Sequence, residues 1–335
     1  MMRVERLPLR ITFNQKIGGT RVAEIFTIIA PVFIIMMLGY GLGKTRLFPD
    51  GSAPILISFV WYVAIPALLF RSLAPNELPD ASELLFVLAY YGSLYVVYAL
   101  AMLSTRLLFG LTTAEQATFA FVTCFGNAGF IGIPIVEGVY GEEGVRLLLM
   151  LVSFHSLTLL PVTTVIVERA ADATEGPGIA SRTFASVRQN PIIIALLVGL
   201  GWSALSLPYP HWLDKVLELP AVAAAPVGLF SVGLSLASVR IAGNITHAMV
   251  AVSLKLMILP LTVFLVAHFL MGLPDVWVGV ATLMAALPSG MIAYSFASQY
   301  GIGARRAATA VLISTGLSAA TLSVVLFGLK AGGLS

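Results

Sequence analysis

Charged residues are scarce in this chain. Of its 335 residues, only 10% are Asp, Glu, Lys or Arg, whereas 59% are hydrophobic and the mean hydropathy is +0.97. A soluble domain carries about 25% charged residues, with which it covers its water-exposed surface. The composition therefore excludes an ordinary soluble protein and predicts an integral protein of the lipid bilayer.

Cysteine is almost absent as well. Cys124 is the single one, which excludes an intramolecular disulfide and a cysteine metal cluster. The four histidines, His155, His211, His247 and His268, lack the spacing of metal ligands, and the chain has no phosphate-binding loop or nucleophile elbow. The loops are too short for an extramembrane catalytic domain. We therefore expect no enzyme, cofactor, metal or nucleic-acid partner.

Long apolar runs are what the chain does have. One crossing of a bilayer takes about 20 residues, and ten runs approach that length: 25–43, 54–73, 84–109, 116–140, 145–167, 190–206, 216–237, 245–270, 276–300 and 306–329. So many runs, the first beginning at residue 25, are not explained by a cleaved signal peptide. Residues 1–24 then form an N-terminal tail and 168–184 a loop.

Similar stretches recur at one constant offset of 160 residues. The pairs are "APVFIIMMLGYGLG" from 30 with "NPIIIALLVGLGWS" from 190, "PALLF" from 66 with "PVGLF" from 226, and "VYGEEGVR" from 139 with "QYGIGARR" from 299. We interpret this as a duplicated five-helix unit, 25–167 and 185–330. Because five is odd, the second copy is inverted in the bilayer, as in many secondary transporters. The alternative is that small residues and prolines merely mark packed helix interfaces.

The fourth and ninth runs are both interrupted in mid-span, at equivalent positions of the two repeats. The fourth contains "TCFGNAGFIGIPIVEGVYG" (123–141) and the ninth "LMAALPSGMIAYSFASQYG" (283–301). An interrupted helix leaves backbone groups unpaired, which a membrane tolerates only inside protein or beside a wet cavity. Free N–H groups at a helix N-terminus favour an anion. We therefore expect the two breaks to form an anion site.

Eight residues of these breaks make up the predicted substrate site. Asn127 offers an amide and Ser289 a hydroxyl. Glycines let backbones approach closely, and prolines remove helical hydrogen bonds that would close the breaks; these residues are Gly126, Gly129, Gly132, Gly290, Pro134 and Pro288. The alternative is a pair of proline kinks that only shape the packing of the helices.

Two further polar residues lie in apolar runs. Lys255 lies about ten residues into the eighth run, close to the bilayer centre at 1.5 Å per residue, where an ammonium marks a functional site by default. It would act as counter-charge, proton carrier or substitute for a coupling cation; the alternative is snorkelling. His155, with its repeat counterpart Thr315, could carry a proton. The alternative for His155 is an interhelical hydrogen bond.

In the motifs "GNAGFIGIPIVEGVYGEEG", "NPIIIALLVGLG", "APVGLFSVGLSLA" and "AALPSGMIAYSFASQYG", the chain resembles the auxin efflux carrier family of plant auxin exporters and bacterial organic-acid permeases. The resemblance covers 25–327. It implies a scaffold domain and a transport domain, crossing fourth and ninth helices, and elevator-type movement. The crossover features fall on Asn127, Pro134 and Pro288. Plant carriers have an asparagine soon after the second proline, where this chain has Ser289 and Gly290, so a malonate- or malate-like acid fits better than auxin.

The expected function is secondary active transport of small organic anions across a bacterial inner membrane, driven by a proton or the membrane potential. The expected partners are a carboxylate, a proton and the bilayer; a homodimer is left open. A sodium/proton antiporter or sodium-coupled symporter of related fold is the alternative. It would require membrane-buried carboxylates, but the acidic residues lie at run ends or in loops, with Glu137 the deepest. A membrane receptor is the third candidate, and no signalling domain supports it.

Overall fold

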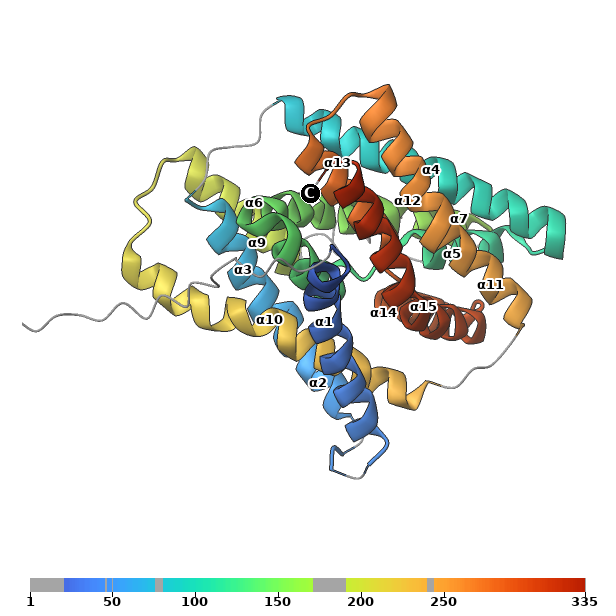
Figure 1. Ribbon diagram of the computed structural model, residues 1–335. Helices are drawn as coiled ribbons and strands as arrows, with labels where there is room; N and C mark the ends of the chain where they lie inside the picture. Colours follow the sequence, from blue (N-terminus) through green and yellow to red (C-terminus); the bar gives the residue numbers. More distant parts are fainter. Residues whose placement is uncertain are drawn as a thin grey trace, which may run out of the picture.

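The computed structural model describes residues 21–45, 47–49, 51–75, 81–170, 191–239 and 244–334 (Figure 1). Within these ranges the regular structure is helical and contains no β-strand; one isolated antiparallel bridge joins Gly126 and Ser289. The all-α prediction is confirmed. Most of the predicted tail 1–24 and loop 168–184 lies outside the described residues.

The helices follow the predicted apolar runs. The first half contains α1 (Arg21–Gly43), α2 (Ser52–Phe59), α3 (Ile65–Leu73), α4 (Ala81–Phe109), α5 (Thr113–Cys124), α6 (Ile133–Phe154) and α7 (Leu160–Ala170). The second contains α9 (Pro191–Ala204), α10 (His211–Ser238), α11 (Ile245–Ser253), α12 (Leu259–Phe264), α13 (Asp275–Ala286), α14 (Met291–Gln299) and α15 (Ala304–Ala331).

Seven helical segments of the described chain are long and apolar enough to cross a membrane, judged by length and composition. Two shorter apolar helices, α9 and α13, accompany them. One of the seven covers 43 residues, Ala128–Ala170, but Gly141 has φ +62° and ψ −152° inside it, a conformation no α-helix contains. The integral membrane prediction is confirmed in this coarse form. The arrangement as ten helices in two inverted repeats stays a prediction.

Prolines follow most of the π-helical turns, in which the helix is wider than an α-helix. Five π-helical turns occur in the described residues: η1 (Val60–Ala64), η2 (Ala128–Gly132), η3 (His155–Leu159), η4 (Leu254–Ile258) and η5 (Leu265–Leu270). After each of the first four, the second residue of the next α-helix is a proline: Pro66, Pro134, Pro161 and Pro260. Proline has no N–H and its ring presses on the preceding turn, which a wider turn relieves. Pro226, the repeat counterpart of Pro66, lies inside the continuous helix α10.

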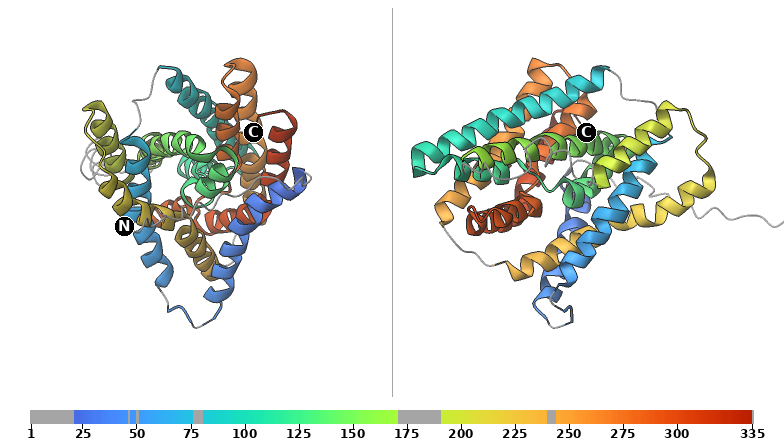
Figure 2. Two further views of the ribbon diagram at one scale, coloured as in Figure 1. Left: turned by 60° about the vertical axis from the view of Figure 1, so that its left-hand side comes forward. Right: turned by 180° about the vertical axis from the view of Figure 1, so that it is seen from behind.

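The helices form two groups (Figure 1). The first group consists of α1, α2, α3, α9 and α10: α1, α2 and α3 pack on α10, and α9 packs on α3. The second group consists of α4, α5, α7 and α11 to α15. In all views the hairpin of α1 and α2 (blue) points away from α4 (teal) (Figure 2). Helix α6 contacts both groups, packing on α13 and on α1, and α15 also touches α1.

Glycine permits the closest contact within the first group, where α1 packs along α10. A Cβ added to Gly39 would lie 2.2 Å from the carbonyl oxygen of Phe230, and one added to Gly233 would lie 1.9 Å from that of Met36. No side chain fits at either distance, so the backbones approach as they do at small-residue interfaces of membrane helices. Gly41, two residues from Gly39, has nothing within 4 Å of an added Cβ.

A capping box fixes the start of α5 in the second group. The Thr112 hydroxyl accepts from the N–H of Glu115, whose carboxylate accepts from the N–H of Thr112 at 3.1 Å. Arg306, at the start of α15, donates to the same carboxylate. Burial acts against the charge, but the hydrogen bonds from Thr112 and Arg306 outweigh it and hold the pKa of Glu115 below its usual range. This ion pair joins the ends of α5 and α15.

Candidate functional site

Both predicted breaks are present as extended backbone between helices. α5 ends at Cys124 and helical structure resumes at Ala128; α13 ends at Ala286 and α14 begins at Met291. Phe125 has φ −78° and ψ 101°, and Leu287 has φ −62° and ψ 149°, both in the extended region. Two helix C-termini and two N-termini therefore lie inside the protein, and their backbone groups need partners.

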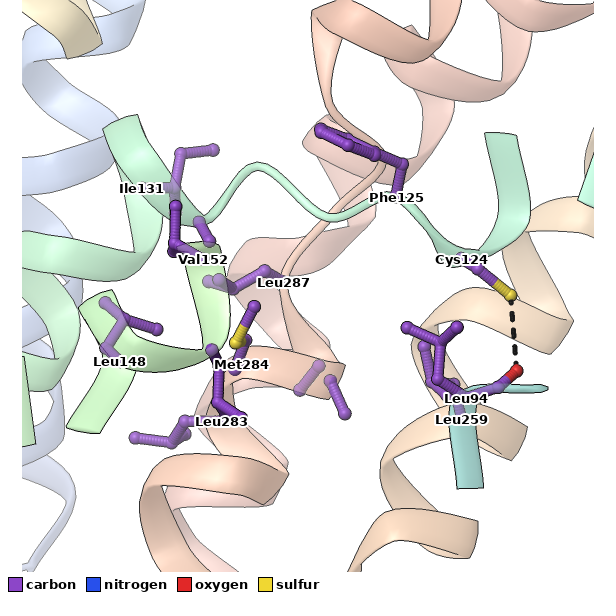
Figure 3. Packing of buried hydrophobic residues seen from close by; sticks show 14 of the residues in the cluster. Leu94, Cys124, Phe125, Ile131, Leu148, Val152, Leu259, Leu283, Met284 and Leu287 are labelled. Carbon is purple, nitrogen blue, oxygen red and sulfur yellow. Dashed lines mark hydrogen bonds between the residues drawn. The ribbon is translucent and has the colours of Figure 1, made fainter. Parts of the chain in front are cut away.

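The two breaks pair with each other through their backbones. The N–H of Asn127 donates to the carbonyl of Pro288 at 2.8 Å, and the N–H of Gly290 donates to the carbonyl of Phe125 at 2.8 Å. Figure 3 shows the stretch after Cys124 passing beside the one after Leu287, with apolar side chains packed around them. These bonds join two segments about 160 residues apart, the repeat offset.

The remaining N–H at the second break also has a partner, since the N–H of Ser289 donates to the Ser314 hydroxyl at 3.1 Å. The N–H groups of Asn127, Ser289 and Gly290 are therefore used by the protein itself. The first-turn N–H groups after each break remain available to a ligand. They belong to Ala128 and Gly129 of η2 and to Met291 of α14. First-turn N–H groups have no intrahelical acceptor.

A small buried cavity of about 40 Å³ lies beside the paired breaks. Its walls come from both helix groups: Trp61, Ile65, Phe125, Gly126, Asn127, Ala128, Gly129, Phe130, Val152, His155, Ile192, Gly290, Met291 and Ile292. The volume suffices for about three water molecules. Two helix N-termini line the same small space, an arrangement that attracts negative charge.

Asn127 and His155 are the polar side chains among these lining residues. Both are buried, at 5% and 2% exposed. Nδ1 of His155 lies 2.6 Å from the hydroxyl oxygen of Tyr91, and Nε2 has no hydrogen-bond partner within the described part of the chain. The residues that line this space thus offer an amide, an imidazole and backbone N–H groups among otherwise apolar side chains.

Lys255 lies behind the breaks and does not line this cavity. It is fully buried in η4, and its Nζ donates to the carbonyl of Ala285 at 3.0 Å, in the last turn of α13. A Cβ added to Gly126 would lie 3.1 Å from Nζ, so the ammonium rests against the backbone that follows α5. A positive charge there compensates the partial negative charge of helix C-termini.

The other predicted residues do not line the cavity. Pro288 supplies a carbonyl to the pairing of the breaks. The hydroxyl of Ser289 is buried and has no partner in the described residues. Gly132 and Pro134 lie past the first break, at the end of η2 and in the first turn of α6. Thr315 donates to Val311 of its own helix.

Sequence reasoning missed the wall provided by the first helix group, Trp61, Ile65 and Ile192. These are ordinary apolar residues of apolar runs, and no local pattern distinguishes them. Ser314 was not singled out either, although its hydroxyl accepts from the Ser289 N–H. It directly precedes the predicted residue Thr315 in the sequence.

Comparison with known proteins identifies a membrane transport protein. A family model described as "Membrane transport protein" matches residues 24–326. The "Putative malonate transporter" of Rhizobium meliloti is 28% identical over 93% of this chain and 98% of that relative. "Auxin efflux carrier component 8" of Arabidopsis thaliana is 23% identical over 84% of this chain and 91% of that relative. The "Uncharacterized transporter YfdV" of Escherichia coli is 24% identical over 85% of this chain.

The apolar helices and the buried cavity between two helix groups are those of an integral membrane transport protein, and the relatives are named as transporters and not as enzymes. The chain belongs to the membrane transport protein family that includes the auxin efflux carriers.

Proposed function

We propose that this protein is a secondary active transporter of small organic anions and that the cavity beside the paired breaks is its substrate site. The observation that carries the proposal is the convergence of two helix N-termini and Asn127 on one buried space. N–H donors there bind a carboxylate without a full cation in contact with it. Gly126, Gly129 and Gly290 leave room for the ligand to reach the backbone.

We further propose the architecture of ten transmembrane helices in two inverted repeats, 25–167 and 185–330. The 160-residue offset and the pairing of the breaks support it, because equivalent segments of the two halves meet as a two-fold relation requires. The fourth and ninth helices are then the crossing helices. The second helix group moves against the first in an elevator-type cycle, exposing the cavity to each side in turn.

The proposed substrates are carboxylates of the malonate, malate or auxin type. A relative named for malonate transport and one named as an auxin efflux carrier support this range. Ser289 and Gly290 follow Pro288 here, without the asparagine of plant carriers, which favours a small acid.

A sodium-coupled or antiport mechanism is less well supported. No Asp or Glu is among the residues lining the cavity, and buried carboxylates are the groups that carry cations through a membrane. Lys255 provides a fixed positive charge at the end of α13, where a coupling cation would otherwise compensate the carbonyl groups. We propose that it does so permanently and that uptake needs no sodium.

The test is uptake of radiolabelled malonate, malate and indole-3-acetate into proteoliposomes. Asn127→Ala should lower kcat/KM for the transported acid about tenfold to a hundredfold, since a hydrogen bond to a charged group contributes about 1.5–3 kcal/mol. Asn127→Asp should abolish uptake by placing a negative charge in the site.

The matched control is Asn244→Ala, since Asn244 is an exposed residue that caps α11 away from the cavity. It should retain wild-type kcat/KM. Currents driven by sodium alone and unaffected by any carboxylate would overturn the proposed function, and so would an Asn127→Ala variant with unchanged uptake.

A further inference from the structure

The hydrogen bonds around His155 determine which of its ring nitrogens carries the proton. The Tyr91 hydroxyl lies 2.6 Å from the carbonyl oxygen of Leu151 and 2.6 Å from Nδ1 of His155. A carbonyl can only accept, so the single hydroxyl proton of Tyr91 points at Leu151. The Tyr91 oxygen is then the acceptor for Nδ1, and Nδ1 must carry a proton.

The neutral ring therefore presents a bare lone pair at Nε2. This nitrogen is buried without a partner, on a side chain that lines the cavity between the helix N-termini. A lone pair repels a carboxylate oxygen, whereas an N–H at the same place would donate to it. An anion can thus use Nε2 only after a second proton has bound to the ring.

We propose that His155 is the proton carrier of this transporter and that each carboxylate binds together with one proton at Nε2. The inference rests on the proposed function, because it assigns the coupling of the same site. Tyr91 is a positioning residue: it selects the tautomer and does not touch the substrate.

The surroundings of the ring leave the counter-charge to the substrate. Tyr90 and Tyr91 face it from α4, at ring-centroid distances of 5.9 and 5.7 Å. The buried ammonium of Lys255 in η4 is a like charge that opposes an imidazolium, so the charged ring needs a bound anion to offset it. Cys124 of α5 turns its thiol toward the Leu94 carbonyl, at 3.7 Å (Figure 3). No carboxylate of the described residues is among these groups, and a buried charge needs a partner. A bound carboxylate supplies that partner to the imidazolium.

The step balances in protons and charge. On the loading side, a proton from water forms an N–H bond at Nε2, and this N–H donates to the carboxylate. After the cavity opens to the other side, the anion leaves and the same N–H bond gives its proton back to water. One proton and one anion cross together, so transport of a monovalent carboxylate is electroneutral.

The experiment measures carboxylate and proton movement in the same proteoliposomes, with radiolabelled malonate, malate or indole-3-acetate outside and a trapped pH dye inside. The wild type should move about one proton per anion and accumulate the anion when the interior is alkaline. In His155→Gln the proton-to-anion ratio of the uptake that remains should fall at least fivefold, because the Gln amide donates a hydrogen bond without titrating.

Tyr91→Phe is the second variant, and it tests the tautomer. Without the Tyr91 oxygen, the neutral ring can carry its proton at Nε2 and donate to the anion, so the ratio should fall while uptake persists. A merely structural role of Tyr91 would lower uptake and leave the ratio at one. His268→Gln is the control, since this half-buried histidine of η5 is not among the cavity-lining residues, and it should keep the wild-type ratio.

Wild-type uptake without proton movement would overturn this inference and leave the proposed function standing. An unchanged ratio in both His155→Gln and Tyr91→Phe would overturn it as well. Absence of uptake of all three acids by the wild type would instead overturn the proposed function, and with it the coupling.

Discussion

At the scale of single residues, buried charge and buried hydrogen-bonding groups are what distinguish this site from its apolar surroundings. Lys255 is fully buried and bonded to Ala285, while His155 keeps one ring nitrogen unpaired beside the cavity. Burying such groups costs free energy unless a partner compensates them. The Lys255 ammonium is paired with the carbonyl of Ala285, whereas Nε2 of His155 has no partner in the described residues and can accept one from a ligand.

Replacing Lys255 tests the fixed charge. Lys255→Met keeps most of the side-chain volume but removes the ammonium. The carbonyl groups at the helix C-termini beside it then lose the positive charge that offsets their partial negative charge. We expect kcat/KM for the transported acid to fall at least tenfold, about 1.4 kcal/mol, and wild-type uptake to be unchanged when choline replaces sodium. Uptake assays in both buffers provide the measurement.

Lys44 offers the matched control for this substitution. Its Nζ donates to the carbonyl of Ala237 at 2.7 Å, near the end of α10, so it makes the same kind of bond outside the cavity region. Lys44→Met should leave kcat/KM unchanged. Equal uptake by Lys255→Met and the wild type would show that Lys255 only caps a helix.

At the scale of the elements, close backbone contact holds the first helix group together. Gly39→Ala would drive a Cβ to 2.2 Å from the Phe230 carbonyl, whereas Gly41→Ala meets nothing within 4 Å. Overpacking of this kind costs about 1–3 kcal/mol. We expect Gly39→Ala to unfold at a clearly lower temperature in detergent than the wild type, and Gly41→Ala to unfold at nearly the wild-type temperature. Equal melting of the two variants would contradict the α1–α10 contact.

At the scale of the whole molecule, the cavity is lined by residues of both helix groups. At about 40 Å³ it has room for about three water molecules, so the walls must part before a carbon skeleton enters. Relative movement of the groups follows from the proposed function. A covalent bond between them should therefore stop transport, while a bond within one group should not.

Cysteine pairs test this movement. The Cβ of Ile28 on α1 lies 3.8 Å from a Cβ built on Gly138 of α6, the usual Cβ separation of a disulfide. Because α6 packs on α13 of the second group, we expect it to move with that group. Ile28→Cys with Gly138→Cys should then lose uptake on oxidation and regain it on reduction. Leu73→Cys with Gly199→Cys, within the first group and 3.0 Å apart by the same measure, should transport in both states. Full uptake by the oxidised first pair would contradict movement of α6 against α1.

Glycine, proline and asparagine made part of the site predictable. The cavity is lined by four of the predicted residues, Gly126, Asn127, Gly129 and Gly290. They could be predicted because residues that break helices are conspicuous in an apolar run. Pro134 lies after the break, not in it, since a π-helical turn accommodates its missing N–H. Sequence reasoning assigned ligand binding to the N–H groups at the breaks, but the backbone pairing uses those of Asn127 and Gly290.

The sequence by itself determined the membrane class, the helical structure and the family, because hydropathy, chain length per crossing and local backbone preferences are properties of neighbouring residues. Only the tertiary structure decided which groups meet: that Tyr91 orients the His155 ring, that Lys255 caps α13, and that Trp61 closes the cavity from the first group. Such contacts join residues far apart in the chain, and their distances depend on how helices pack, which no local pattern records.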